Sequence, residues 1–436
     1  MSDMDFIVAP RWLIPVIPKG VTLENQAVVI KKGRIAEILP TEIAKMRFPQ
    51  IEYINRPNHI LTAGFINAHT HTPMTLLRGC ADDLDLATWL NEHIWPLETK
   101  WVDRSFVRDG SDLAIIEMIS SGTTCFHDMY LFPDETAAIA AEHCIRACVS
   151  MIVIDTATSW AKDSSEYIEK GLKVHDQYRD HPLIKTSFGP HAPYTVNEKE
   201  LIQITTLSNQ LEVPIHMHIN ETESEIDQSI DHFGLRPLQR LEKLGMLSPS
   251  LNAVHMTQLN DDEIVKLSEL NVNVIHCPES NMKLASGGCR INDLLSAGVN
   301  VALGTDGAAS NNDLDMLGEM KSAALLAKHI GSNACAISTS EALEMATING
   351  AKALGLEDEI GSIEPNKAAD MICIDLSAAA TQPVLNPLST LIYSASRNQV
   401  SDVWVAGKSL YKNNEFEICN QQTILKKTHE WAKKLI

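Results

Sequence analysis

The chain of 436 residues is long enough for one large domain and one smaller domain, and its 44% hydrophobic residues can fill a substantial core. The formal net charge of −20 excludes a nucleic-acid partner, because contact with a phosphate backbone requires a basic face.

The start of the chain is acidic and lacks the charged-then-apolar pattern of a signal peptide, and no apolar run reaches the length of a membrane span. The nine cysteines include no Cys-x-x-Cys pair and no spacing typical of a disulfide framework. These features predict a cytoplasmic protein with reduced thiols and no membrane partner.

Residues 1–60 contain short strand patterns at Phe6–Val8, Gln26–Ile30 and Arg34–Ile38. The dipeptide Lys32-Gly33 between the last two is a tight-turn signal. This part of the chain predicts a small sheet.

From residue 60, β-branched runs alternate with helical patterns. The helical patterns include Glu198–Gln210, Glu223–Leu244, Asp262–Leu270 and Asp313–Ile330. The runs are Ile60–Ala68, Thr123–Asp128, Cys148–Asp155, Lys185–His191, Val213–Asn220, Asn252–Gln258, Val272–Cys277 and Val299–Asp306. Eight alternations predict an α/β fold, a (β/α)8 TIM barrel. A doubly wound open sheet also alternates, but no Gly-x-Gly-x-x-Gly follows a strand, which weakens that alternative.

After residue 360 the pattern changes again. Gly361–Lys367 is a turn-rich bend, and Asp370–Asp375 and Val403–Lys408 have strand patterns. The tail Gln421–Ile436 is a basic amphipathic helix, which we interpret as a capping element with one solvent-exposed face.

The polar residues fall where the predicted barrel strands end. The first run leads into His69-Thr70-His71, and side chains one residue apart on a strand point the same way, which suits zinc. Such a pair also arises by chance. The other strand ends carry His127-Asp128, His191, His216 to Glu221, His255, and Thr305-Asp306. Because carboxyl ends of barrel strands meet at one rim, these side chains are expected to gather there.

A zinc site follows from this gathering. His69, His71, His218 and Asp306 supply three nitrogens and one carboxylate, and zinc would lower the pKa of a bound water toward ~7. Asp306 is also placed to take a proton from that water. Glu221 can carry a proton to a leaving group, and His255 can orient the attacking water.

The combined set His69-x-His71, His218, His255 and Asp306 resembles the amidohydrolase superfamily. The resemblance implies that segments 1–60 and 361–436 pair into one small β-sandwich domain beside a metal-dependent barrel of residues 61–360. Dinuclear members carry a modified lysine at the end of strand four, where this chain has His191. The resemblance is therefore to the mononuclear branch, with one Zn²⁺ per subunit.

More narrowly, Met74–Gly79, His93–Glu98 and His218–Thr222 are similar to the 5′-methylthioadenosine/S-adenosylhomocysteine deaminase family. This resemblance implies a small-molecule nucleoside substrate and hydrolytic deamination at C6 of the purine. It implies that Glu98 binds the ribose hydroxyls, that His191, Glu221 and Asp306 contact the substrate, and that Ser310 lies near its leaving end. Trp89 and Trp95 are candidates for an apolar wall against a methylthio group. The family often forms dimers or larger assemblies, so a homo-oligomer is expected.

Two alternatives stay open at this point. A same-fold deaminase or chlorohydrolase could act on a free base or a triazine, for example guanine or an oxidised purine. A metal-free binding or scaffold protein is the other alternative, although no ligand position is missing from the sequence.

Overall fold

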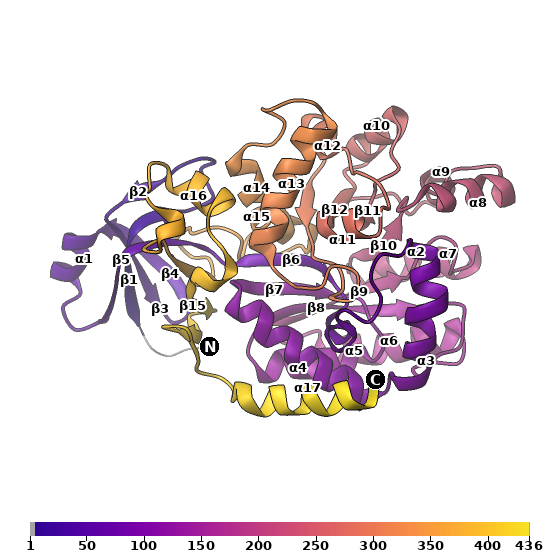
Figure 1. Cartoon of the computed structure of the whole chain (residues 1–436), viewed down its shortest axis with the longest axis horizontal. Helices are drawn as coiled ribbons and strands as arrows, with labels where there is room; N and C mark the ends of the chain where they lie inside the picture. The colour runs from indigo at the N-terminus through magenta and orange to yellow at the C-terminus, as the bar shows by residue number, and fades with distance from the viewer. Residues whose placement is uncertain (1–4, 436) are drawn as a thin grey trace.

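The computed structural model describes residues 5–435, so the acidic start of the chain and Ile436 at the end of the predicted tail helix lie outside it. The described residues form two sheets, an eight-stranded barrel sheet and a nine-stranded terminal sheet. Figure 1 shows the terminal sheet at the left end of the molecule, with the barrel strands beside it.

The barrel sheet is all parallel and follows chain order. Its strands are β6 (Phe65–Thr70), β7 (Thr123–Asp128), β8 (Arg146–Val153), β9 (Ile184–Pro190), β10 (Ile215–Ile219), β11 (Leu251–His255), β12 (Asn273–His276) and β13 (Val301–Leu303). The last strand returns to the first, because the backbone N–H of Asp306 donates to the carbonyl of His69 at 3.0 Å. The predicted α/β barrel is confirmed, and the domain predicted as a β-sandwich of both termini is a separate nine-stranded sheet built from both ends of the chain.

Closure brings the backbones of β6 and the segment after β13 very close together. A Cβ atom on Gly304 would lie 2.7 Å from both the Cβ and the backbone nitrogen of His69. A glycine is therefore required two residues before Asp306 for this approach.

Helices cover the outside of the barrel (Figure 1). They are α4 (Arg104–Ser120), α5 (Pro133–Glu142), α6 (Ser164–Tyr178), α7 (Glu198–Leu211), α8 (Glu223–Phe233), α9 (Pro237–Lys243), α10 (Asp261–Glu269), α11 (Pro278–Lys283), α12 (Ile291–Ser296), α13 (Met316–Ile330), α14 (Thr339–Met345) and α15 (Ile348–Ala353). Side-chain N-caps fix the start of many of them, for example Asp103 for α4 and Asn197 for α7. The predicted helix Glu223–Leu244 is wrong in one respect, because Gly234 at φ 68° ends α8 and Pro237 begins α9.

The terminal sheet combines both ends of the chain in the order β17-β16-β15-β14-β5-β1-β3-β4, with β2 beside β1. Its strands are β1 (Phe6–Ile14), β2 (Leu23–Glu24), β3 (Gln26–Lys31), β4 (Arg34–Pro40), β5 (Glu52–Ala63), β14 (Met371–Asp375), β15 (Val400–Val405), β16 (Lys408–Lys412) and β17 (Glu415–Phe416). Its helices are α1 (Thr41–Arg47) and α16 (Pro387–Tyr393), with 3₁₀ turns at Ala379–Thr381 and Arg397–Gln399. The domain boundaries at 60/61 and 360/361 stay a prediction.

Residue 64 is the junction between the two sheets. Ala63 pairs with Met371 in the terminal sheet, whereas the next strand residue, Phe65, pairs with Thr123 in the barrel. The run predicted as one strand, Ile60–Ala68, is therefore two strands that belong to different sheets. A buried ion pair spans the same junction, since Arg146 at the start of β8 donates to both oxygens of Asp370 at 3.0 and 3.2 Å.

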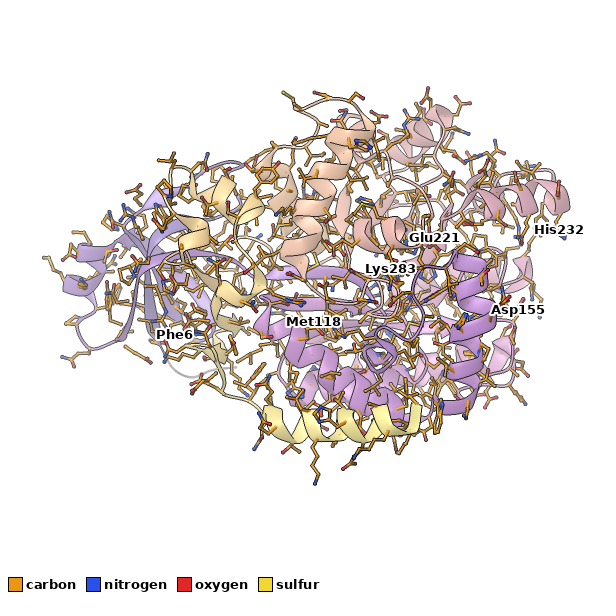
Figure 2. All side chains as sticks on the ribbon, in the orientation of Figure 1. Phe6, Met118, Asp155, Glu221, His232 and Lys283 are labelled. Carbon is orange, nitrogen blue, oxygen red and sulfur yellow. The ribbon has the colours of Figure 1, made fainter. Side chains whose placement is uncertain are left out.

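One long connection separates β6 from α4. It holds a 3₁₀ helix η1 (Thr72–Leu77), α2 (Leu86–Thr88), a π-helix η2 (Trp89–Ile94) and α3 (Trp95–Trp101). In Figure 1, α2 and α3 stand at the opposite end of the barrel from the terminal sheet. Figure 2 likewise shows Phe6 of the terminal sheet and Glu221 of the barrel rim toward opposite ends of the molecule.

The tail helix α17 (Gln421–Leu435) lies along α4, as Figure 1 shows at the bottom of the view. Trp431 is buried against Phe106 and donates its Nε1–H to Asp109 at 2.9 Å. Among the described residues, no helix combines the length and the apolar character needed to cross a membrane.

Candidate metal centre and substrate cavity

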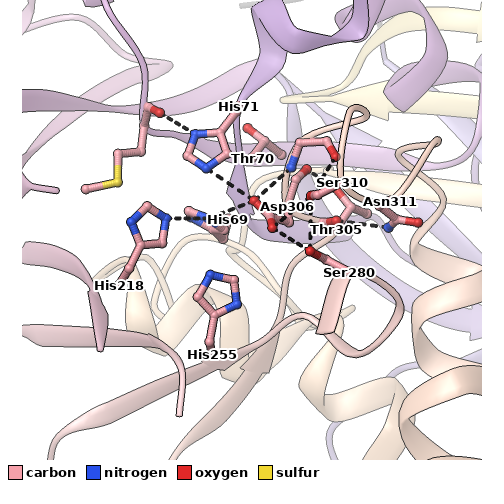
Figure 3. A network of polar contacts seen from close by, with 12 residues as sticks. His69, Thr70, His71, His218, His255, Ser280, Thr305, Asp306, Ser310 and Asn311 are labelled. Atoms are coloured by element: carbon pink, nitrogen blue, oxygen red, sulfur yellow. Dashed lines mark hydrogen bonds and ion pairs between the residues drawn. The ribbon is translucent and has the colours of Figure 1, made fainter. Parts of the chain in front are cut away.

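Five side chains meet at the carboxyl ends of the barrel strands. His69 lies on β6 and His71 directly follows it, His218 lies on β10, His255 ends β11, and Asp306 follows β13. Figure 3 shows the four imidazoles grouped around the Asp306 carboxylate. The sequence predicted this gathering from strand ends alone, and the fold places the five residues side by side.

The donor atoms are close enough for one cation. Oδ1 of Asp306 lies 3.3 Å from Nε2 of His69 and 3.2 Å from Nε2 of His71. Nε2 of His218 lies 3.2 Å from Nε2 of His69. These atoms fall within two overlapping groups of possible metal ligands, one of which also includes His255. Three imidazole nitrogens and one carboxylate are donors that zinc prefers, so the residues present fit this metal.

The second nitrogen of each imidazole ligand is held by the protein. Nδ1 of His71 donates to the carbonyl of Met129 at 2.5 Å, and Nδ1 of His218 donates to the carbonyl of His191 at 2.8 Å. Nδ1 of His69 contacts Nε2 of His216 at 2.8 Å. Because the Nδ1 atoms are engaged, the three Nε2 atoms are left to face the centre, as metal ligands require.

Burial sets the charge of these groups. It lowers the pKa of His69 to about 4 and holds the pKa of His218 well below its ordinary value, so both rings are neutral, the form that binds metal. For His71, burial is outweighed by the hydrogen bond and charge of Asp306, which raise its pKa to about 9. For Asp306, the same contacts with His69 and His71 outweigh burial and hold its pKa well below the ordinary value.

His255 faces the centre with a defined ring orientation. Asn281 Nδ2 donates to its Nδ1 at 3.0 Å, so the neutral ring carries its proton on Nε2. That Nε2 lies 3.7 Å from Glu221 Oε2. His255 can therefore donate a hydrogen bond into the space beside Glu221, as the sequence interpretation requires.

Glu221 is a buried acid with an unusual pKa. Burial and the nearby charge of Asp306 raise the pKa of Glu221 to about 8, although a 3.3 Å hydrogen bond from Ser286 opposes the shift. Its backbone N–H donates to Glu225 Oε2 at 2.7 Å, which fixes the start of the loop after β10. At neutral pH the Glu221 carboxyl holds a proton and can act as a general acid.

A cavity of about 470 Å³ opens over the metal ligands, which is the size of a small-molecule site. Glu98 and His191 line it together with Glu221, and Trp89 and Trp95 belong to its apolar wall. The wall is completed by Met74, Leu86, Leu90, Ile94, Met129, Leu131, Ile152, Ile154, Ala157 and Leu284.

Glu98 is positioned by a tyrosine that the sequence did not indicate. Tyr130, which follows β7, donates its hydroxyl to Glu98 Oε1 at 2.5 Å, and burial raises the pKa of the Glu98 carboxyl. Within residues 5–435 no hydrogen bond to the other carboxylate oxygen is found, and Glu98 lines the cavity. His191 is half-buried beside His218, and removal of its ring from solvent lowers its pKa to about 4, so it is neutral.

Ser310 is not among the residues that line the cavity, and its implied place near the leaving end of the substrate stays a prediction. Its hydroxyl donates to Asp306 Oδ2 at 3.0 Å, and that of Ser280 donates to the same oxygen at 2.7 Å. Ser310 is 2% exposed. The structure thus places Ser310 against Asp306, where its hydroxyl can orient the carboxylate.

Sequence reasoning noted His127 and His216 as polar strand ends but gave neither a role. Both are fully buried inside the barrel, and His216 contacts the metal ligand His69. Asn281 and Glu225 were missed altogether, since they lie on helices beside the strand ends. Only their distance to His255 and Glu221 in the folded chain reveals them.

Known proteins are similar to this chain over most of its length. The model of the amidohydrolase family matches residues 60–410. A Teredinibacter turnerae protein named 5-methylthioadenosine/S-adenosylhomocysteine deaminase is 47% identical over 434 residues, which cover 100% of this chain and 98% of that protein. A Methanobrevibacter smithii protein named 5′-deoxyadenosine deaminase is 39% identical and covers 94% of this chain and 94% of its own length. The crystal structure of an adenosine deaminase from Xanthomonas campestris with bound zinc superimposes with a TM-score of 0.98 at 46% identity, covering 99% of this chain and 98% of the other.

Proposed function

The chain belongs to the amidohydrolase family, and we propose that it is a zinc-dependent hydrolytic deaminase of adenosine-type nucleosides. The substrates we assign to it are 5′-methylthioadenosine and, as a second compound to test, S-adenosylhomocysteine, with the inosyl product and ammonia released. The observation that carries the proposal is the meeting of His69, His71, His218 and Asp306 under a cavity that also holds Glu98 and Glu221.

His69, His71, His218 and Asp306 hold one Zn²⁺ per subunit in this proposal. When bound, zinc lowers the pKa of its water toward ~7 and so supplies the nucleophile for attack on C6 of the purine. Asp306 accepts the proton of the attacking water, because its carboxylate is ionised and lies at the centre of the site. His255 orients that water through its Nε2–H.

Glu221 then acts as the general acid. Its raised pKa keeps the carboxyl protonated at neutral pH, so it can deliver a proton to a ring nitrogen as C6 becomes tetrahedral. Asp306 passes the proton that it took from the water to the amino group at C6, so the C6–N bond breaks and ammonia leaves, while the C6 hydroxyl returns a proton to Glu221 as the carbonyl of the product forms. Glu221 and Asp306 thus divide the acid and base work between a neutral and an ionised carboxyl, whose pKa values the site pushes apart.

Glu98 and His191 recognise the nucleoside. A carboxylate oxygen of Glu98 can accept hydrogen bonds from the vicinal ribose hydroxyls while Tyr130 holds the other oxygen. His191 lines the cavity as a neutral ring, so it can donate or accept a hydrogen bond to the substrate. Ser310 acts indirectly, by orienting Asp306.

A substrate panel tests the proposal directly. The zinc-loaded protein is assayed for ammonia release from 5′-methylthioadenosine, S-adenosylhomocysteine, 5′-deoxyadenosine, adenosine and guanine, and for chloride release from a chlorinated triazine. We expect turnover of the 6-aminopurine nucleosides and none of the free base or the triazine. Absence of ammonia from all of the nucleosides would overturn the deaminase assignment.

A single substitution separates nucleoside from free-base activity. Glu98→Gln removes the negative charge that binds the ribose, so kcat/KM for nucleosides should fall by about 100-fold while the fold is retained. Unchanged kcat/KM in this variant would favour the free-base alternative. Metal analysis of the purified protein addresses the scaffold alternative, which requires well under one bound ion per chain.

We also infer a homo-oligomer in a reducing, cytoplasmic compartment. The nine cysteines are all free, which agrees with reduced thiols. Sedimentation of the purified chain at several concentrations would test the oligomer, and a monomer at every concentration would refute it.

A further inference from the structure

Two histidines with no role in the proposed reaction lie beneath the metal ligands. His216 lies on β10 two residues before His218, and His127 lies on β7. Both are 0% exposed, and neither lines the cavity. A polar side chain in the interior of a barrel is costly unless it makes a hydrogen bond, so each needs a physical reason to be there.

Among the residues that the structure describes, His216 makes one such hydrogen bond, and its partner is the proposed metal ligand His69. Its Nε2 lies 2.8 Å from Nδ1 of His69, and the two rings are nearly parallel, with an interplanar angle of 26°. The opposite nitrogen of His69, Nε2, is the one that faces Asp306 and His218. A neutral His69 that offers Nε2 to a metal must carry its proton on Nδ1, and His216 Nε2 is then the acceptor for that proton.

His216 is itself held in place from below. Its ring meets that of His127 edge to face, with centroids 3.8 Å apart and an interplanar angle of 79°. His127 Nε2 is fixed by the hydroxyls of Ser187 at 2.7 Å and Ser150 at 3.1 Å. A column of buried side chains therefore runs from two serines on neighbouring strands, through His127 and His216, to His69.

We infer that His216 is a positioning residue for the metal site, which fixes the tautomer and the ring orientation of His69 by accepting its Nδ1–H. The other two imidazole ligands use backbone carbonyls for this purpose, those of Met129 and His191. A backbone carbonyl cannot be removed by substitution, whereas the acceptor for His69 is the side chain of His216 and can be replaced. The inference rests on the metal site of the proposed function.

The test measures zinc affinity of the full chain by competition with a chromophoric chelator. His216→Leu removes the acceptor, and we expect zinc affinity to fall by about 10- to 100-fold, the usual effect of losing such a partner. His216→Gln should stay within about 3-fold of the unmodified chain, because its carboxamide oxygen can accept in place of Nε2. The cobalt-substituted proteins supply a second readout, since the visible spectrum of the Leu variant should change and that of the Gln variant should not.

His276 offers a matched control. It is also 0% exposed in the barrel, but neither of its ring nitrogens has a hydrogen-bond partner among the described residues. His276→Leu should leave zinc affinity within about 3-fold. An equal loss in the His216 and His276 variants, or no loss in a folded His216→Leu protein, would overturn the inference.

Two further outcomes keep the test decisive. If His216→Leu does not fold, the zinc affinity of His216→Gln is compared with that of His216→Asn, whose side chain is polar but one methylene too short to reach His69. Equal zinc affinities of these two variants would refute the inference. If the unmodified chain binds no zinc, the proposed function fails, which is a different result from tight zinc binding that is indifferent to residue 216.

Discussion

The cavity wall makes a prediction about the 5′ position of the nucleoside. The cavity is lined by Leu86, Leu90, Ile94 and Glu98, which follow one another at intervals of four residues. An apolar face of the α2–α3 segment therefore leads up to Glu98, the carboxylate proposed to bind the ribose. Among the described residues that line the cavity, there is no lysine or arginine. A substituent beyond the ribose therefore meets a lining of apolar, hydroxyl and acidic side chains without a lysine or arginine among the described residues.

The two substrates named for the relatives differ at this position. 5′-Methylthioadenosine adds one thioether methyl, whose burial contributes about 0.8 kcal/mol. S-adenosylhomocysteine adds an ammonium and a carboxylate, and the carboxylate finds no cation in the lining. Leaving it without a partner at a partly solvated site costs about 3 kcal/mol, which corresponds to about 100-fold in kcat/KM. We expect 5′-methylthioadenosine to be the better substrate by this factor.

The assay uses a third compound to separate charge from size. 5′-Butylthioadenosine carries a thioether chain as long as that of homocysteine but without its charges, and it should be turned over within about 10-fold of 5′-methylthioadenosine. Thr156 is exposed and lines the cavity, so Thr156→Arg should raise kcat/KM for S-adenosylhomocysteine by about 10-fold, whereas Thr156→Gln should not. Equal kcat/KM for the two natural compounds would refute the reasoning, and a butylthio analogue as poor as S-adenosylhomocysteine would indicate length instead of charge.

Three further predictions concern single residues. Burial and the charge of Asp306 raise the pKa of Glu221 to about 8, and its protonated form is the proton donor, so kcat/KM should fall as pH rises through about 8. The Glu221→Gln variant should lower kcat by about 1000-fold. A pH profile of kcat/KM that stays flat to pH 10 would contradict this role. Ser310→Ala removes one of the two serine hydroxyls that donate to Asp306 Oδ2, so kcat should fall by up to about 10-fold with KM unchanged. A selective rise in KM would instead indicate that Ser310 contacts the substrate. Asp370→Asn leaves the buried Arg146 without its anion, so the free energy of unfolding measured with denaturant should fall by about 3–5 kcal/mol while zinc affinity is retained. A fall of less than ~1 kcal/mol would show that the ion pair is dispensable.

The sequence carries enough information to predict the barrel and its rim. Alternation of β-branched runs with helical patterns identifies the eight strands, and parallel strands place their carboxyl ends at one edge. His69, His71, His218, His255 and Asp306 follow from this rule because each lies at or just after a strand end.

The strand prediction is wrong where a contact between distant segments, and not the local sequence, decides where a strand ends. Ile60–Ala68 is continuously apolar and favours one strand, but the chain passes from one sheet to the other at Gly64. A Cβ there would lie 2.1 Å from Oγ1 of Thr124, so the crossing depends on a neighbour 60 residues away, which no local pattern encodes. The contact of Ser310 with Asp306 likewise depends on the fold, because it forms only when β13 returns to β6.

Side chains that support the site could not have been predicted. Tyr130 holds Glu98, and Asn281 holds His255, through single contacts between distant segments. Buried tyrosines and asparagines satisfied by any neighbour are common in protein cores. Nothing in the order of residues distinguishes these two until the fold brings their partners within hydrogen-bond distance.

The backbone at the rim gives a physical reason why the metal site and the barrel cannot be separated. Asn220, His255 and Asp306 follow or end three different strands, and all have left-handed φ values, of 52°, 74° and 62°. For residues other than glycine this conformation costs roughly 1–2 kcal/mol each. It turns the chain sharply at the strand end. Asp306 at the same time closes the barrel with its N–H and offers its carboxylate to the centre. Strain of this kind persists only where the surrounding structure over-determines it, so the hydrogen bonds that close the barrel also hold Asp306 in its functional orientation.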